Sequence, residues 1–424
     1  MVADDYRGVL DHVNVDRVLA LEQALIRIPS STFKEHEIAD YLADYMAGLG
    51  MSVEMMDVEH PYDHSMPNTR QPIARLPGTD AGPSLMLNAH MDPGVEMSGW
   101  SVDPYGAKFE DGWVWGMGAH DDKGGIVAAV CAIEAVIKSG TRLRGDVLIC
   151  PVVAHKLGGA GTRALLRHGV RADLGINLEH SANTIASVVV GMIRGKIKTK
   201  SPDLFFRYSA AAKSRYFNPI EQQGEIMRRM GPSLDGVMPG SWLTFTPHAD
   251  LPGFPKIMYD AIYKEHYYYP SVTTLTTREC EMFFQMRTVP GMTVESVRRD
   301  LARLLEACKR DVPAFDYELR IPVFENDGWL QEPTEVSRDH PLVNALAEGH
   351  RLASGREPEI GGALRIGNVG DGNIMHAAGI PSIQYGPGDI RIYPEWPAAD
   401  ERVKLEDLVV ASKAIAYATC RLCG

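Results

Sequence analysis

The chain has 424 residues, a length that predicts two domains rather than one ordinary core. Its apolar share of 45% and its charged share of 23% are typical of a water-soluble globular protein. A net charge of −12 argues against nucleic acid or an anionic membrane as partner, and no run approaches the roughly 20 apolar residues of a membrane span.

Helical and strand patterns alternate through the first part of the chain. Apolar residues at helical spacing predict helices over Val15–Ile28 and Glu35–Leu49, and residues 51–57 are expected to form a strand. Strand-like and helix-like segments then follow in turn: Leu85–Asn88, Gly125–Ile137, Val147–Val153, Thr162–His168 and Leu174–Leu178. This order predicts an α/β domain with a mostly parallel central sheet and helices on both faces.

The pattern changes after Ser187. Strands are expected over Val188–Thr199 and Thr273–Arg287, and helices over Asn218–Met230 and Val294–Cys308. Between them lies a loop-rich tract, residues 231–270, with the run His266–Tyr269 near its end. We interpret residues 187–320 as an inserted, smaller α+β domain. Residues 1–186 and 321–424 are then the two parts of the first domain.

The six cysteines lie mostly in apolar segments and are expected to be buried free thiols. Cys420 and Cys423 have the spacing of a redox or metal pair, but they end a predicted helix and have no second pair. No signal peptide is visible at the N-terminus. A reduced, cytoplasmic setting is therefore the expectation.

The stretch from Leu85 to Ile126 carries the strongest chemical signal. Its first apolar run ends in His90-Met91-Asp92, and its second part ends in Asp121-Asp122-Lys123-Gly124-Gly125 before an apolar helix. In open α/β sheets ligands and metals gather at the carboxyl ends of strands. The H-x-D alone is weak evidence, because a histidine bonded to an aspartate in a turn gives the same pattern.

The joint pattern is more specific. After H-x-D come Trp100, Asp103-Pro104, Asp111-Gly112 and then G-x-G-A-x-D-D-K-G-G. In this combination the chain resembles the aminoacylase/carboxypeptidase family of co-catalytic zinc exopeptidases and deacylases, from about Leu21 to the C-terminus. The resemblance implies a catalytic domain whose inserted lid forms the roof of the cleft. It also implies a homodimer formed through the lid, and a small carboxylate-bearing molecule as substrate.

The resemblance further implies a metal site. In the family one metal is held by the histidine of H-x-D, the aspartate of D-x-K-G and an acid after a later strand. These positions are His90, Asp121 and Glu179 here, and Asp92 matches the residue that orients the ligand histidine. The neighbouring His120 and His180 are expected to point away and to pack, because neighbours in strands and turns face opposite ways.

The ligands of the family's second metal are missing. The family has a Glu-Glu pair, a general base and then a ligand, where this chain has His155-Lys156. The last ligand, a histidine four residues before a glutamate, is replaced by Pro397. We therefore expect one divalent ion per chain, manganese or zinc, with cobalt also compatible. Lys156 disfavours a second cation, and His155 takes the place of the base. The alternative is an inactive relative.

Three further residues are candidate substrate contacts. Arg287 resembles a lid arginine that grips a substrate carboxylate in several members, although a structural arginine at a strand end fits as well. Asn373 lies in the glycine-rich turns near the C-terminus and is a candidate polar contact. Tyr208 or Ser209 stands roughly where many members have an oxyanion-stabilising lid histidine.

Together these residues predict a metal-dependent hydrolase that cleaves a C–N bond of a small carboxylate-bearing substrate with metal-activated water. The most specific expectation is an atypical aminohydrolase that converts 5-nitroanthranilate into 5-nitrosalicylate and ammonia, a reaction of one member of the resembled family. The alternative in the same class is a dipeptidase or N-acyl-amino-acid deacylase. The alternative in another class is a non-catalytic binding or scaffold protein that kept the fold.

Overall fold

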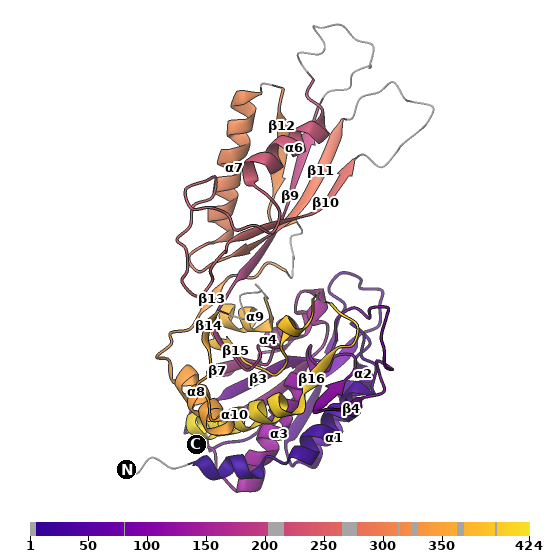
Figure 1. Cartoon of the computed structure of the whole chain (residues 1–424), viewed down its shortest axis with the longest axis vertical. Coiled ribbons are helices and arrows are strands. Elements are labelled where there is room, and N and C mark those ends of the chain that lie inside the picture. Colours follow the sequence, from indigo (N-terminus) through magenta and orange to yellow (C-terminus); the bar gives the residue numbers. More distant parts are fainter. Residues whose placement is uncertain are drawn as a thin grey trace. The chain divides into compact units, whose positions relative to one another are not determined.

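The computed structural model of the chain describes residues 6–79, 81–201, 216–264, 278–312, 314–323, 329–362, 369–394 and 397–424. These residues form two compact units (Figure 1). Unit 1 comprises Met1–Val189 and Thr334–Gly424, and unit 2 comprises Val190–Pro333. The inserted unit thus begins and ends later than the predicted boundaries of 187 and 320. Its end lies later because Gln331 still pairs with Met192 in a β-bridge.

The strands of unit 1 form a nine-stranded sheet in the order β1-β2-β6-β3-β7-β15-β8-β13, and β14 pairs with β8. They are β1 (Ser52–Val58), β2 (Thr69–Leu76), β3 (Leu85–His90), β6 (Val147–Val152), β7 (Leu174–Asn177), β8 (Ile185–Val189), β13 (Thr334–Glu335), β14 (Ile360–Gly362) and β15 (Ser382–Gln384). The central pairs β6–β3, β3–β7 and β7–β15 are parallel, whereas β1–β2, β2–β6, β15–β8 and β8–β13 are antiparallel. The predicted α/β class with a parallel centre is confirmed.

Two groups of helices cover this sheet. The helices of unit 1 are α1 (Val15–Ile26), α2 (His36–Gly48), α3 (Lys123–Ser139), α4 (Ala160–Arg167), α8 (Pro341–Ser354), α9 (Asp371–Ala377) and α10 (Leu405–Cys423), with 3-10 turns η1 (Tyr6–His12), η2 (His155–Leu157) and η3 (Ile390–Ile392). Helices α3 and α10 pack on each other and on β3, and α4 and α9 pack together on the opposite face (Figure 1). A small separate sheet joins β4 (Lys108–Glu110), β5 (Trp113–Trp115) and β16 (Arg402–Lys404).

The central strands read as continuous apolar runs because both of their faces are covered. All six residues of β3 and all six of β6 are buried, as expected for parallel strands between helix layers. Strand β3 extends to His90, two residues beyond the predicted end, so that the histidine is the last residue of the strand. Helix α3 is buried from Lys123 to Val136 because it lies between the sheet and α10.

Unit 2 is a four-stranded antiparallel sheet with two helices. The order is β10-β11-β9-β12, formed by β9 (Gly191–Lys200), β10 (Lys256–Lys264), β11 (Glu279–Thr288) and β12 (Asp316–Arg320), with α6 (Pro219–Met230) and α7 (Val294–Asp311) packed on it. The tract 231–270, predicted to be rich in loops, also contains the strand β10, which was not predicted. A bulge between Tyr259 and Ala261 shifts the register of that strand, which obscures its alternating pattern.

Two further predictions concern this part of the chain. The strand predicted over Val188–Thr199 is in fact two strands, β8 and β9, which belong to different units. The aromatic run His266–Tyr269 lies outside the described residues.

The six cysteines are all buried and free, as predicted. None of the described helices combines the length and the apolar character that a bilayer crossing requires.

Candidate metal centre

Three neighbouring parallel strands bring the candidate residues to one edge of the sheet. His90 ends β3, His155 follows β6 in the turn η2, and Glu179 follows β7. Because β6, β3 and β7 are adjacent and parallel, their carboxyl ends lie together. Asp121 joins them from the segment just before α3.

The three residues expected to hold a metal converge. The Nε2 atom of His90 lies 3.0 Å from Oδ1 of Asp121 and 3.8 Å from Oε1 of Glu179. All three side chains are buried, and none of these three atoms has a hydrogen-bond partner among the described residues. Buried polar atoms are normally satisfied, and a divalent cation would satisfy all three at once. Among the described residues, two overlapping groups have ligand atoms close enough to surround an ion: His90, His155 and Glu179, and Asp121, Glu179 and His180. The residues at this edge of the sheet therefore fit a divalent metal, and the expected ligands are divided between the two groups.

Asp92 positions the histidine through its backbone. The Nδ1–H of His90 donates to the carbonyl oxygen of Asp92 at 2.8 Å, which leaves Nε2 facing the carboxylates. The Asp92 carboxylate binds the backbone of the turn η2. Its Oδ1 accepts from the N–H of His155 at 2.9 Å, and its Oδ2 accepts from the N–H of Lys156 at 3.1 Å. Asp92 thus contacts His90 through its carbonyl oxygen, with its Oδ1 3.7 Å from the same nitrogen, and its carboxylate anchors the turn η2.

A second buried acid holds the start of the same turn. Ala154 has a left-handed backbone with φ of 52°, and its N–H donates to Oε1 of Glu35 at 2.8 Å. Burial, together with the nearby charge of Asp92, raises the pKa of Glu35 to about 8. The turn that carries His155 and Lys156 is therefore fixed by two carboxyl groups that contact its successive backbone N–H groups.

Lys156 occupies the far side of Asp121. Its Nζ lies 2.9 Å from Oδ2 of Asp121, while Oδ1 of the same carboxylate faces His90. Burial favours a higher pKa for Asp121, but the charge of Lys156 and the nearby His90 outweigh it and hold that pKa well below the usual range. The Asp121 carboxylate is thus ionised and shared between an imidazole and an ammonium group.

His155 forms a pair with Asp371, which the sequence analysis did not single out. Its Nδ1 lies 3.1 Å from Oδ2 of Asp371, and its Nε2 lies 3.7 Å from Oε1 of Glu179. Its ring stacks on that of His90, with centroids 4.3 Å apart and planes 8° apart. Burial lowers the pKa of His155, but Asp371 and Glu179 outweigh it and raise that pKa to about 9.

A glycine permits this pairing. Gly159 has a φ of 70°, and a Cβ there would lie 2.3 Å from Ile374 and 2.6 Å from the Asp371 carboxylate. Only glycine lets the chain after η2 approach α9 so closely. In the sequence, the signal for Asp371 is an acid beside Asn373 in the glycine-rich turn.

His180 also faces the centre, which corrects the prediction that it points away. Its Nδ1 lies 3.7 Å from Oδ1 of Asp121 and 3.7 Å from Oε2 of Glu179. The alternation argument fails because Glu179 and His180 lie beyond the end of β7, outside the strand that the argument assumes. His120 packs as predicted, between the rings of His180 and Tyr393.

Glu401 organises the segment before α3. Its carboxylate accepts from the backbone N–H groups of Gly118, His120 and Asp121 at 2.8–3.0 Å. Burial, together with the charge of Asp121, raises the pKa of Glu401 to about 7. The family's terminal glutamate thus remains in place and supports Asp121, although the histidine expected four residues earlier is Pro397.

Comparison with known proteins identifies the family. Residues 86–420 match the profile of peptidase family M20/M25/M40. The chain belongs to that family. It is therefore a metal-dependent hydrolase, and the alternative of a non-catalytic scaffold is not supported.

The M20 chain resembles known proteins over nearly its whole length. It is 26% identical to N-formyl-4-amino-5-aminomethyl-2-methylpyrimidine deformylase of Halalkalibacterium halodurans, over 98% of the chain and 97% of that protein. In fold it matches aminopeptidase PepT from Bacillus cereus, with a TM-score of 0.74, 16% identity and coverage of 97% and 99%. It also matches a dinuclear metal-binding M20 peptidase from Bacillus subtilis, with a TM-score of 0.67, 17% identity and coverage of 96% and 97%.

The three candidate substrate residues of this M20 enzyme are not shown to form one site. Asn373 caps its own turn, because its Oδ1 accepts from the backbone N–H of Gly370 at 3.1 Å. Arg287 belongs to β11 of unit 2, where its guanidinium donates to Gln285 at 2.9 Å and contacts the sulfur of Met192. Tyr208 lies outside the described residues. Their roles toward substrate stay predictions.

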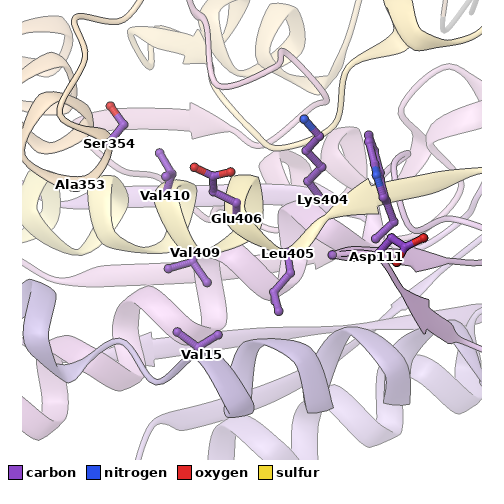
Figure 2. A pocket seen from close by; sticks show the side chains of 11 residues that line it. Val15, Asp111, Ala353, Ser354, Lys404, Leu405, Glu406, Val409 and Val410 are labelled. Atoms are coloured by element: carbon purple, nitrogen blue, oxygen red, sulfur yellow. The ribbon is translucent and has the colours of Figure 1, made fainter.

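A surface cavity of about 540 Å³ lies elsewhere on unit 1. Figure 2 shows Val15 of α1 and Leu405 and Val409 of α10 along it, with the charged Lys404 and Glu406 nearby. None of the residues that line it is a candidate metal ligand or a partner of His155.

Proposed function

We propose that this M20 enzyme uses a single metal ion to hydrolyse a C–N bond of a small, carboxylate-bearing substrate. The observation that carries the proposal is the contact of 2.9 Å between Nζ of Lys156 and Oδ2 of Asp121. In the resembled family the residue at position 156 is a glutamate ligand of the second metal. Here that position holds an ammonium group, which contacts the proposed ligand Asp121 and cannot itself bind a cation.

Charge balance supports one ion rather than two. The facing carboxylates of Asp121, Glu179 and Asp371 are buried and together carry three negative charges. One divalent cation and the Lys156 ammonium would balance these three charges while His155 is neutral, the form in which it can act as a base. A second divalent cation would add two positive charges to a site of low dielectric, next to a protonated amine, where like charges repel strongly.

His90, Asp121 and Glu179 would hold the ion, for which we propose manganese or zinc. A divalent ion bound there would act as a Lewis acid and would lower the pKa of a bound water molecule toward neutrality. His90 is pre-oriented for this task by the Asp92 carbonyl, and Asp121 by the Glu401 carboxylate beneath its segment. Such outer contacts fix the geometry of the first ligands.

We assign the proton transfer to His155. Asp371 holds Nδ1 of the imidazole, so that Nε2 points toward Glu179 and the centre. The raised pKa of about 9 favours protonated His155, whereas a cation bound beside it would favour the neutral imidazole. The neutral imidazole takes a proton from the attacking water and delivers it to the leaving nitrogen, the task that the glutamate base performs in the resembled family. Lys156, whose side chain is 31% exposed, lies at the open edge and can stabilise negative charge that develops on the substrate.

Two candidate substrate types follow. Similarity to a deformylase along the whole chain supports a small N-acyl compound, such as an N-formyl or N-acyl amino acid. The specific expectation from the sequence is the amine of 5-nitroanthranilate, because one metal and a histidine suffice for attack on an electron-poor ring. In the proposal Arg287, Tyr208 and Asn373 contact the substrate, and unit 2 forms a homodimer in the cytoplasm.

The test is product release by metal-loaded protein. We expect a C–N bond to be cleaved in at least one of four probes: an N-formyl amino acid, an N-succinyl amino acid, a dipeptide and 5-nitroanthranilate. His90→Ala should abolish that turnover while the circular dichroism spectrum stays unchanged. Failure to release amine or ammonia from any probe would contradict the proposal. Absence of 5-nitrosalicylate alone would remove only the specific substrate.

A further inference from the structure

We propose that His180 is a fourth protein ligand of the ion, so that two imidazoles and two carboxylates hold it. The inference rests on the proposed function only in requiring that one divalent ion binds at this centre. His180 directly follows Glu179 in the chain, and sequence reasoning placed it among the packing residues.

The distances around His180 are those of ligand atoms that share an ion. Metal–ligand bonds of about 2.0–2.2 Å place neighbouring ligand atoms roughly 3–4 Å apart. The Nδ1 of His180 lies 3.7 Å from Oδ1 of Asp121 and 3.7 Å from Oε2 of Glu179. For comparison, the Nε2 atom of His90 lies 3.0 Å from Oδ1 of Asp121 and 3.8 Å from Oε1 of Glu179, both of which are proposed ligands.

The two imidazoles flank the same pair of carboxylates. Glu179 presents Oε1 toward His90 and Oε2 toward His180, so its carboxylate lies between the two rings. Oδ1 of Asp121 faces both nitrogens, and this oxygen has no hydrogen bond among the described residues. The ligand atoms of Asp121, Glu179 and His180 lie close enough together to surround an ion, so an ion held by the two carboxylates would be within reach of His180.

Packing holds the His180 ring in this orientation. The ring is buried, and its centroid lies 4.5 Å from that of His120. His120 in turn meets the edge of Tyr393 at 5.5 Å with planes 87° apart. A ring locked by its neighbours loses little rotamer freedom when it binds an ion, which favours ligation.

His155 is the competing candidate, and its stacking argues against it. The His90, His155 and Glu179 atoms are also close enough to surround an ion. However, the rings of His90 and His155 are nearly parallel, with planes 8° apart and centroids separated by 4.3 Å. Nitrogen lone pairs lie in the ring plane, so two stacked, nearly parallel imidazoles are poorly placed to bind the same ion. His155 therefore stands beside the ion as the proton carrier.

A fourth protein ligand has a consequence for the choice of metal. Zinc is usually four-coordinate, and a hydrolytic site must keep a position open for water. Four protein ligands would close a tetrahedral zinc site, whereas a six-coordinate ion such as manganese keeps open positions. The inference thus favours manganese as the ion that supports turnover.

X-ray absorption spectroscopy on the manganese-loaded full chain tests the inference, because it counts imidazoles bound to the ion. We expect two imidazoles in the wild type and one in both His180→Ala and His180→Gln. The glutamine variant keeps the size of the side chain, so it serves if alanine disturbs the fold. His155→Gln is the matched control and should retain two. Manganese affinity, measured by calorimetry, should fall at least about 10-fold in both His180 variants.

Two results would overturn the inference: a count of two imidazoles that persists in His180→Gln, or a count that drops to one in His155→Gln. Both leave a single-metal hydrolase intact, so they are distinct from a failure of the proposed function. That failure would show as no bound metal, or as two ions per chain in the wild type.

Discussion

At the scale of single residues, the Asp371–His155 pair is the contact on which the proton transfer depends. The two residues are far apart in the chain, yet their side chains meet at 3.1 Å in a buried setting. A carboxylate bonded to one imidazole nitrogen fixes the ring and selects the nitrogen that faces the reaction. Asp371 is therefore a positioning residue for His155.

Asp371→Asn should lower kcat by about 10–100-fold, the cost typical of losing such an outer contact. The amide cannot supply the negative charge that supports the imidazole. Metal content should remain that of the wild type, because Asp371 is not among the proposed ligands. The exposed Asp339→Asn is the control. A loss of bound metal together with activity would assign Asp371 to the ion instead.

We propose that the residues at positions 155, 156 and 397 determine how many ions bind. Replacing them together, as His155→Glu, Lys156→Glu and Pro397→His, restores the side chains that the resembled family uses for its base and second metal. We expect the metal content to rise from about one to about two equivalents, because the repelling ammonium is gone and two ligands return. Elemental analysis measures this. An unchanged content would show that something other than these side chains excludes the second ion.

At the scale of elements, the turn η2 depends on the buried Glu35. Glu35→Ala should lower the free energy of unfolding by about 1–3 kcal/mol, because the Ala154 N–H loses its partner away from water. Glu35→Gln keeps an acceptor oxygen and should cost less. Urea denaturation of the two variants measures the difference, and equal losses would show that the hydrogen bond is unimportant.

The same residue gives stability a pH dependence. The native pKa of Glu35 is about 8, above its ordinary value of 4.5, so between these pH values the native state binds more protons than the unfolded chain. Stability therefore falls as pH rises through this window. Glu35→Gln removes this contribution. From pH 5 to pH 8 the melting temperature of the variant should therefore rise relative to that of the wild type. A constant difference would contradict the raised pKa.

How far the sequence predicts these elements depends on the range of the contacts. The strands β3, β6 and β7 were predictable because each is a short apolar run, and parallel strands place His90, His155 and Glu179 at one edge. The contact between Asp371 and His155 was not predictable, because no local sequence pattern indicates that α9 packs against η2. His180 was misjudged because the alternation rule was applied beyond the end of a strand. The bulged β10 was missed for a similar reason, since its pattern is interrupted.

At the scale of the whole molecule, every proposed ligand lies in unit 1. Val189 and Thr334, where the chain leaves and re-enters this unit, are paired partners in β8 and β13. A two-residue Asn-Gly turn can join such partners as a hairpin. Replacing residues 190–333 in this way should leave a folded protein that binds the same amount of manganese.

Light scattering of that shortened chain tests the dimer at the same time. We expect a monomer, in contrast to a dimeric full chain, because the proposal places the dimer interface in unit 2. A dimer that persists without residues 190–333 would locate the interface in unit 1. Loss of metal binding in a folded, shortened chain would show that unit 2 contributes to the centre.

The most direct test of the whole account is the number of metal ions in the native full-length protein, by elemental analysis paired with an accurate protein concentration. The account predicts about one divalent ion per chain, lost in His90→Ala and retained in His155→Gln. Two ions per chain in the wild type would contradict it, because the Lys156 ammonium would then not have replaced the second metal.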